Sequence, residues 1–144
     1  MECIVVSEIS VPISSDLDIL AARQKGRALV KELGFTPVEA TLFATTISEL
    51  ARDILFRANS GEITLKPLQR EQRSGIMVRA AYDRGATIRS TASVAPHYDA
   101  TSTWSRLVLK QVKYLVDEME FGFRSGGGAT MTAIKWRHQR VASG

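Results

Sequence analysis

The stretch TTISELARDILFR, from Thr45 to Arg57, decides the fold because it predicts an amphipathic helix with two carboxylates beside its apolar face. Its apolar residues recur at helical spacing. Glu49 and Asp53 are four residues apart, so a helix places them one above the other at the edge of that face. The pair has two interpretations: a salt-bridged helix edge, with Arg52 and Arg57 in reach, or the acidic part of a site.

Capping signals fix the frame of this helix. Thr36 predicts the N-cap, Pro37 the first turn and Glu39 the reciprocal capping residue, a combination typical of a helix start. The turn-forming run Asn59-Ser60-Gly61 predicts its end. The two carboxylates therefore lie in the second half of a long helix.

The residues before this helix predict a strand and another helix. Cys3 to Val11 alternates as a strand does, and Pro12 is expected to end it. Ser15 and Asp18 predict a capping box that opens a helix, and Gly34 predicts its C-terminal cap.

The residues after the central helix predict two hairpins separated by one helix. Glu62–Leu68 and Gly75–Tyr82 are expected to form the first hairpin around a polar loop, Gln69–Ser74. Thr103 is expected to cap a helix from Trp104 to Met119, and Phe121–Phe123 with Ala129–Trp136 to form the second hairpin. The expected fold is an α+β two-layer sandwich, in which a mixed, largely antiparallel sheet is covered on one face by three helices. Residues 1–137 are expected to form a single domain and 138–144 a flexible tail.

Composition excludes several classes of chemistry. With one cysteine, Cys3, and two histidines among 144 residues, neither a zinc site nor a cysteine–histidine pair is supported. No apolar run approaches the length of a membrane span, so a cytoplasmic protein is expected. The net charge is +4, with two basic clusters, but no recognition pattern for nucleic acid accompanies them, so binding of nucleic acid is not favoured over a solvated basic surface. These clusters are Arg70, Arg73, Arg79, Arg84 and Lys135, Arg137, Arg140.

Five motifs carry a resemblance to a known family. They are DILAARQKGR with KELGF (18–27, 31–35), the helix 45–54, YDRG (82–85), LVDEM (115–119) and AIKW (133–136). On these residues the chain resembles the GHKL (Bergerat) ATPase-fold serine/threonine kinases of bacterial partner-switching modules, the anti-sigma-factor type. The resemblance runs from near residue 16 to near residue 137.

The resemblance implies roles for particular residues. A glutamate that activates the attacking hydroxyl matches Glu49, and an asparagine that holds Mg²⁺ four residues later matches Asp53, a departure that adds negative charge beside the nucleotide. An aspartate that accepts a hydrogen bond from adenine matches Asp83. Of the two glycines that follow in the family, Gly85 matches the first, and Thr87 replaces the second.

The phosphate lid of the family is the motif that this chain lacks. Glycine lets several backbone amides turn toward one anion, yet no glycine occurs between Gly85 and Gly122. The segment 86–103 is expected to be a lid or its remnant, and Trp104 and Leu107 are expected to crowd the phosphate position. Arg106 and Lys110 remain as candidates for holding phosphates.

Three functions stay open on this basis. The first is a partner-switching regulator with a degenerate ATP site that binds a STAS-domain antagonist and a sigma factor or phosphatase, with Arg23 and Arg27 as partner-binding candidates or as ordinary solvated arginines. The second is an active serine/threonine kinase that uses ATP and Mg²⁺. The third is a basic surface that binds nucleic acid or an acidic protein.

Overall fold

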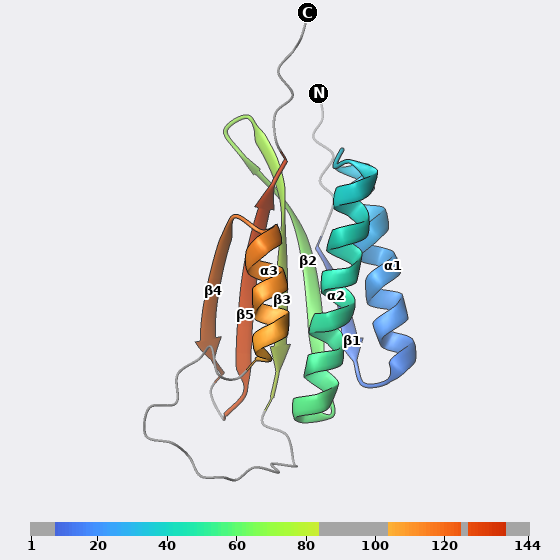
Figure 1. Cartoon of the computed structure of the whole chain (residues 1–144), viewed down its shortest axis with the longest axis vertical. Helices are drawn as coiled ribbons and strands as arrows, with labels where there is room; N and C mark the ends of the chain where they lie inside the picture. Colours follow the sequence, from blue (N-terminus) through green and yellow to red (C-terminus); the bar gives the residue numbers. More distant parts are fainter. Residues whose placement is uncertain (1–7, 84–103, 125–126, 138–144) are drawn as a thin grey trace, which may run out of the picture.

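The structure is a computed structural model that describes residues 8–83, 104–124 and 127–137. Within these ranges, a sheet and a layer of helices lie against each other (Figure 1). In chain order the elements are β1 (Ile9–Ile13), α1 (Asp16–Glu32), α2 (Pro37–Ala58), β2 (Gly61–Arg70), β3 (Arg73–Tyr82), α3 (Arg106–Leu115), β4 (Glu118–Phe123) and β5 (Ala129–Trp136).

The sheet has the strand order β1-β2-β3-β5-β4, and each neighbouring pair is antiparallel. The predicted α+β architecture is therefore confirmed. A mixed sheet would also contain a parallel pair of strands, but all four pairings among the described strands are antiparallel. The helices lie on one face, with α1 and α2 toward the β1 edge and α3 toward the β4 edge (Figure 1).

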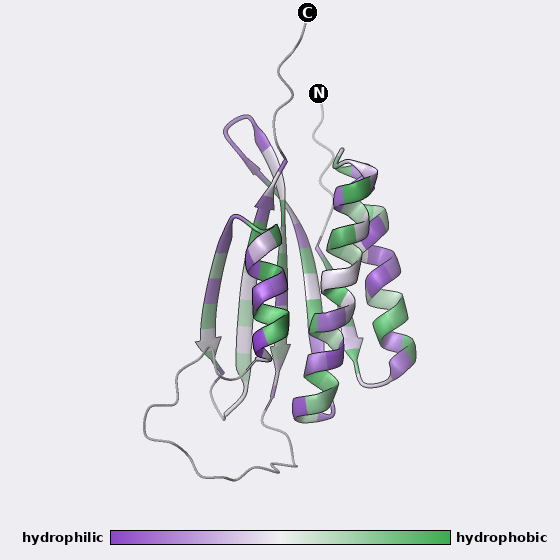
Figure 2. Ribbon diagram, in the orientation of Figure 1, coloured by the Kyte–Doolittle hydropathy of each residue, from purple (hydrophilic) through white to green (hydrophobic). Residues whose placement is uncertain are grey.

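The core lies between the helices and the alternating residues of the strands. Ile63 and Leu65 of β2, Ile76 of β3 and Met131 of β5 are fully buried there, and Ile47 of α2 packs against them. Hydrophobic and hydrophilic residues are interspersed along all three helices (Figure 2). Each helix buries some of its apolar residues in the core, and its outer side also carries exposed apolar residues such as Leu17, Phe56 and Leu107.

The two long helices pack closely through a glycine. A Cβ atom on Gly26 of α1 would overlap with Cδ1 of Ile47 on α2, so the isoleucine side chain would have to move. The absence of a side chain at Gly26 therefore lets α1 approach the helix that carries the two carboxylates.

The predicted start of α2 is confirmed. The Thr36 hydroxyl accepts a hydrogen bond from the backbone N–H of Glu39 at 3.1 Å, and the Glu39 carboxylate accepts one from the Thr36 N–H at 2.9 Å. At the other end Asn59 takes the left-handed conformation, with φ of 65°, as a helix-ending residue.

The predicted capping box of α1 is wrong in its geometry. Ser15 is the N-cap, but its side chain accepts no capping hydrogen bond. Instead, the Asp18 carboxylate accepts hydrogen bonds from the Ser14 N–H at 2.8 Å and from the Ser14 and Ser15 hydroxyls. The hydrogen bond from the Ser14 backbone is the largest cause that lowers the pKa of Asp18 below its ordinary value.

Three predicted boundaries are also corrected. β1 continues through Pro12 to Ile13, since an edge strand tolerates a residue without an N–H on its outer side. The first hairpin pairs out to Arg70 and Arg73, so its loop is two residues long rather than Gln69–Ser74. The third helix is α3, with Ser105 as its N-cap, and it stops at Leu115 instead of continuing to Met119, which lies in β4.

The first basic cluster is partly used for packing. The guanidinium carbons of Arg70 and Arg73 each lie 4.7 Å from the centre of the Trp136 ring, and the indole N–H of Trp136 donates to Glu118 at 3.0 Å. These cation–π contacts join the tip of the first hairpin to β5. Several predictions lie outside the described residues: Cys3, Gly85, the segment 86–103, Thr103 and the tail 138–144.

Candidate functional site

Asp53, the candidate metal ligand, is buried where α2 meets the start of α3. Its side chain is 6% exposed. Oδ2 accepts a hydrogen bond from the backbone N–H of Ser105 at 2.8 Å, and Oδ1 accepts one from Nε of Arg57 at 3.3 Å. Since Ser105 is the N-cap of α3, the Asp53 carboxylate ties the beginning of α3 to α2.

Glu49, the candidate catalytic base, lies one turn earlier on α2 in a different environment. Its side chain is 38% exposed, and its Oε2 lies 3.0 Å from Nη1 of Arg52. The geometry of Glu49 is therefore that of a salt-bridged helix edge. The two carboxylates share a helix side but differ in what holds them, one in a surface ion pair and the other in a tertiary hydrogen bond.

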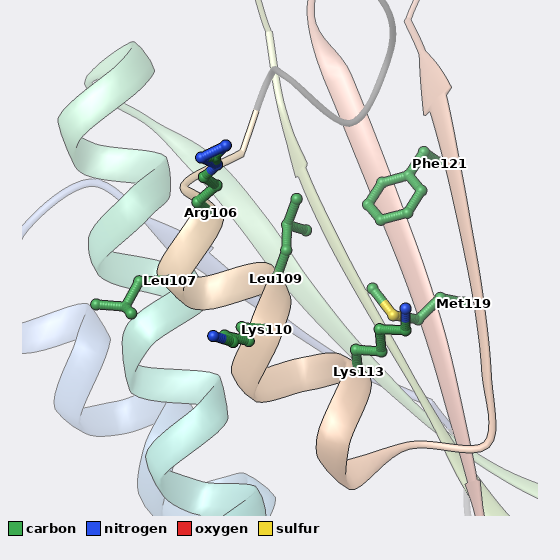
Figure 3. A pocket seen from close by; sticks show the side chains of 7 residues that line it. All are labelled: Arg106, Leu107, Leu109, Lys110, Lys113, Met119 and Phe121. Carbon is green, nitrogen blue, oxygen red and sulfur yellow. The ribbon is translucent and has the colours of Figure 1, made fainter.

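Trp104 stands directly before the N-cap of α3 and is part of the core. It is 2% exposed, and its ring makes an edge-to-face contact with Tyr82 at the end of β3, with 5.3 Å between centroids and 62° between planes. Its indole N–H is buried and has no hydrogen-bond partner in the described part of the chain. Leu107, expected to crowd the phosphate position together with Trp104, is 72% exposed and points toward α2 (Figure 3).

Asp83, the candidate adenine-binding residue, directly follows β3 and is exposed. Its Oδ1 accepts a hydrogen bond from Nη1 of Arg124 at 2.8 Å, and Nη2 of Arg124 lies 3.5 Å from Glu62 at the start of β2. Arg124 thus joins the ends of three strands, and the Asp83 carboxylate is part of that junction. Gly85, the other candidate of this motif, falls in the undescribed range 84–103.

Arg106 and Lys110, the candidate phosphate-holding residues, line a pocket of about 760 Å³ beside α3. The other lining residues are Leu107, Leu109, Lys113, Met119 and Phe121 (Figure 3). Met119 and Phe121 belong to β4, so this pocket extends from α3 toward the edge of the sheet. Glu49, Asp53 and Asp83 are not among its lining residues.

Arg23, a candidate for partner binding, lies in a hollow of about 280 Å³ between α1 and α2. Leu20 of α1 lines the same hollow and is 46% exposed, and Arg52 of α2 completes its basic side. Arg27, one turn farther along α1, is also exposed. Both arginines are thus accessible on the outer side of α1.

Among the described residues, Asp53 does not belong to a cluster of metal-binding side chains. Over residues 8–83, 104–124 and 127–137, no group of three or more histidine, cysteine, aspartate or glutamate side chains is close enough to share a cation. Both carboxylate oxygens of Asp53 already accept hydrogen bonds from protein donors. In this structure the Asp53 carboxylate is thus engaged by two N–H groups of the protein.

Sequence reasoning placed Arg57 within reach of Asp53 but missed the distant residues that engage the two aspartates. Ser105 is 52 positions from Asp53, and Arg124 is 41 positions from Asp83. No local pattern identifies such partners. The apolar lining from β4 was also missed, although the alternation of Met119 and Phe121 would have placed both on the helix side of the sheet.

Together these features define the chain as a two-layer α+β protein, in which a helix with two carboxylates packs against a shorter helix over an antiparallel sheet. No protein-family model matches it. The curated serine/threonine-protein kinase RsbT of Bacillus subtilis (strain 168) is 37% identical over 126 residues, which cover 88% of this chain and 94% of that protein. The chain therefore belongs to the family of RsbT, and the relationship that the motifs predict is confirmed. None of the described helices combines the length and the apolar character that crossing a bilayer requires.

Proposed function

We propose that this chain is a partner-switching regulator of the RsbT type that acts by protein–protein binding, and that its ATP site is degenerate. The proposal rests on the family membership and on one observation, the engagement of Asp53 by the Ser105 N–H and by Arg57. In the family pattern this position holds Mg²⁺. Here a cation would have to displace a buried hydrogen bond to bind the same oxygens.

The surroundings of Asp53 support the same conclusion. Trp104 fills the core between the end of β3 and the start of α3, where the family has a glycine-rich approach to the phosphates. Oδ1 of Asp83 is paired with Arg124 at 2.8 Å, so adenine would have to share this carboxylate with an arginine. The protein itself therefore already contacts or fills the expected positions of magnesium at Asp53, of the phosphates near Trp104 and of adenine at Asp83.

Isothermal titration calorimetry with Mg²⁺ and ATP tests the proposal directly. We expect no binding tighter than about 1 mM. The variant Asp53→Asn restores the residue of the family pattern, and we expect it to remain unable to bind because Trp104 still occupies the approach. A micromolar dissociation constant for the wild-type chain would overturn the degenerate site. Recovery of binding in the variant would identify the charge of Asp53 as the single cause.

The exposed side of α1 is the proposed partner-binding surface. Arg23 and Arg27 are four residues apart, so they project from the same side of the helix, and Leu20 offers an apolar contact beside them. A STAS-domain antagonist is the proposed partner, and a sigma factor or a phosphatase is the proposed target. Residue types of this kind, arginine beside exposed leucine, are typical of protein interfaces.

Charge reversal within one helix tests this surface. Arg23→Glu is expected to weaken binding to a purified STAS-domain antagonist by about tenfold or more. The matched control is Lys25→Glu, which makes the same charge change on another side of α1 and should change the affinity by less than about twofold. Equal losses in the two variants would mean that overall charge, rather than this surface, determines binding.

A second candidate function is an active serine/threonine kinase, which the relationship to the serine/threonine-protein kinase RsbT and the exposure of Glu49 favour. Glu49 would accept the proton of the attacking hydroxyl, Asp53 would hold Mg²⁺, Asp83 would bind adenine, and Arg106 and Lys110 would hold phosphates. Bound ATP would supply the phosphoryl group. Transfer of labelled phosphate to the partner that is abolished by Glu49→Ala would favour this function, and absence of transfer to a partner that binds would remove it.

A further inference from the structure

The pocket beside α3 is a trough with an apolar floor. Its floor is made of Leu109 from α3 and of Met119 and Phe121 from β4. Met119 pairs with Ala133 and Phe121 with Met131, both buried, so the two β4 side chains lie on the helix side of the sheet. Figure 3 shows them opposite Leu109 and Lys113, with the trough between helix and strand.

One wall of the trough is a row of cations. Arg106, Lys110 and Lys113 occur at intervals of four and three residues, which places them on one side of α3, and all three are exposed. The helix contains no acidic residue. In the part of the chain that the structure describes, none of the three cations has an ion-pair partner. This wall therefore presents uncompensated positive charge over a rise of about 10 Å.

The opposite wall is a sheet edge. β4 pairs with β5 on one side, and no other described strand pairs with it. An exposed strand edge offers backbone N–H and C=O groups at regular spacing to an added strand. A strand added here would turn every second side chain toward the trough, where Met119 and Phe121 already point.

A second copy of this chain is a poor occupant of this edge. Antiparallel pairing of β4 with β4 of another copy would keep the helices of both copies on the same face of the joined sheet. The three cations of one α3 would then face the three cations of the other. Because like charges repel, this pairing is disfavoured, and the positive charge of the trough favours an acidic partner.

From this arrangement we infer that β4 and α3 form a docking site for an extended acidic segment of a partner protein, which adds as a strand to β4. On the helix side the segment carries apolar residues over Leu109, Met119 and Phe121, with carboxylates against the cations of α3. On the other side it carries uncharged or basic residues, because Glu118 and Glu120 of β4 point that way. This site is separate from the α1 surface, and its cations Arg106 and Lys110 would here contact carboxylates of the partner instead of phosphates.

A fluorescein-labelled heptapeptide, Glu-Thr-Leu-Thr-Leu-Thr-Glu, is the probe, and fluorescence anisotropy is the readout. Its alternate residues place two leucines between two carboxylates on one side. We expect a dissociation constant tighter than about 1 mM, weakening as the screening length falls from about 10 Å in about 0.1 M salt to about 3 Å in about 1 M salt. The peptide with lysine in place of both glutamates should not bind.

Two sets of variants test the position and the mode of binding. Lys110→Glu with Lys113→Glu should weaken binding of the peptide by about tenfold or more, whereas the charge-matched pair Lys25→Glu with Lys31→Glu on α1 should change it by less than about twofold. Both pairs replace exposed lysines, and an unchanged midpoint of urea unfolding checks that each variant is folded. In methyl NMR spectra, Leu109 and Met119 should shift and the buried Val30 should not.

Backbone methylation of the peptide separates strand addition from loose charge attraction. Methylating one alternating set of its amides should abolish binding, because those N–H groups donate to β4, and methylating the other set should leave binding intact. If the peptide still binds with either set of amides methylated, strand addition is overturned. If the two lysine pairs lose equal affinity for the peptide, the location of the site beside α3 is overturned. Displacement of the peptide by a single-stranded DNA oligonucleotide, or a dimer that Met119→Lys dissociates, would assign the trough to nucleic acid or to a second copy and overturn the proposal.

Discussion

Removing the Asp53 carboxylate provides the sharpest test of how α3 is held. Asp53→Ala leaves the Ser105 N–H without its acceptor and frees Arg57. A hydrogen bond to a charged acceptor contributes about 1.5–3 kcal/mol. The partly buried pair with Arg57, four residues away, adds about 0.3–0.5 kcal/mol. We therefore expect the free energy of unfolding to fall by about 2–3 kcal/mol.

Urea unfolding, monitored by circular dichroism, measures this change. An unchanged slope of the unfolding free energy against urea concentration would show that the denatured state is unaffected. Glu49→Ala is the matched control, because it removes the other carboxylate of the same helix and breaks only the exposed pair with Arg52. Its cost should stay within about 0.5 kcal/mol, since exposed ion pairs contribute little. Hydrogen exchange of the Ser105 amide should quicken in Asp53→Ala and stay slow in the control.

Two results would refute this reasoning. One is a loss in Asp53→Ala that lies within about 0.5 kcal/mol of the loss in Glu49→Ala, which would make the hydrogen bond to Ser105 energetically irrelevant. The other is an unchanged exchange rate of the Ser105 amide, which would mean that the amide has another acceptor.

Three further changes test separate parts of the fold. Trp104→Ala should reduce the free energy of unfolding, measured by urea unfolding, by about 3–5 kcal/mol because it removes a fully buried ring. Trp104→Phe should cost less because it keeps an aromatic ring and removes the N–H that has no partner among the described residues. Gly34→Ala should cost about 1–2 kcal/mol in the same assay because the residue has φ of 92°, and Gly34→Asn should cost less because asparagine tolerates this left-handed conformation. Asp18→Asn should be less stable than the wild type at neutral pH. Because folding lowers the pKa of Asp18, its contribution is present above the unfolded pKa of about 3.9 and is lost as the pH falls through the folded pKa. The difference in unfolding free energy between the wild type and Asp18→Asn should therefore shrink below about pH 4. A difference that grows below about pH 4 would contradict this prediction.

The sequence allows prediction of the elements where local signals agree. Thr36 and Glu39 cap α2 as expected because the capping box depends only on residues three apart. The helical spacing from Thr45 to Arg57 and the alternation in β2, β3 and β5 give the layers and the hydrophobic core. Family motifs add the relationship to RsbT, which the 37% identity confirms.

Boundaries set by tertiary contacts could not be predicted in this way. The first hairpin extends to Arg70 and Arg73, whose side chains stack on Trp136 of a strand more than 60 residues away in the chain. α3 ends at Leu115 because the following residues enter β4, which pairs with β5. In both places the local pattern allows a longer loop or a longer helix, and pairing with a distant strand decides between them.

The contacts of Asp53 suit an aspartate better than the asparagine that the family resemblance implies at this position. Both of its oxygens accept hydrogen bonds, Oδ2 from the Ser105 N–H and Oδ1 from Arg57. An asparagine side chain has one accepting oxygen and one donating NH₂ group, so it could satisfy one of these donors and would turn a donor toward the other. Asp53→Asn should therefore keep the hydrogen bond to Ser105, lose the one to Arg57 and cost about 1 kcal/mol. A variant as stable as the wild type would mean that the aspartate is not needed to hold α3, and the family's asparagine would then fit this arrangement equally well.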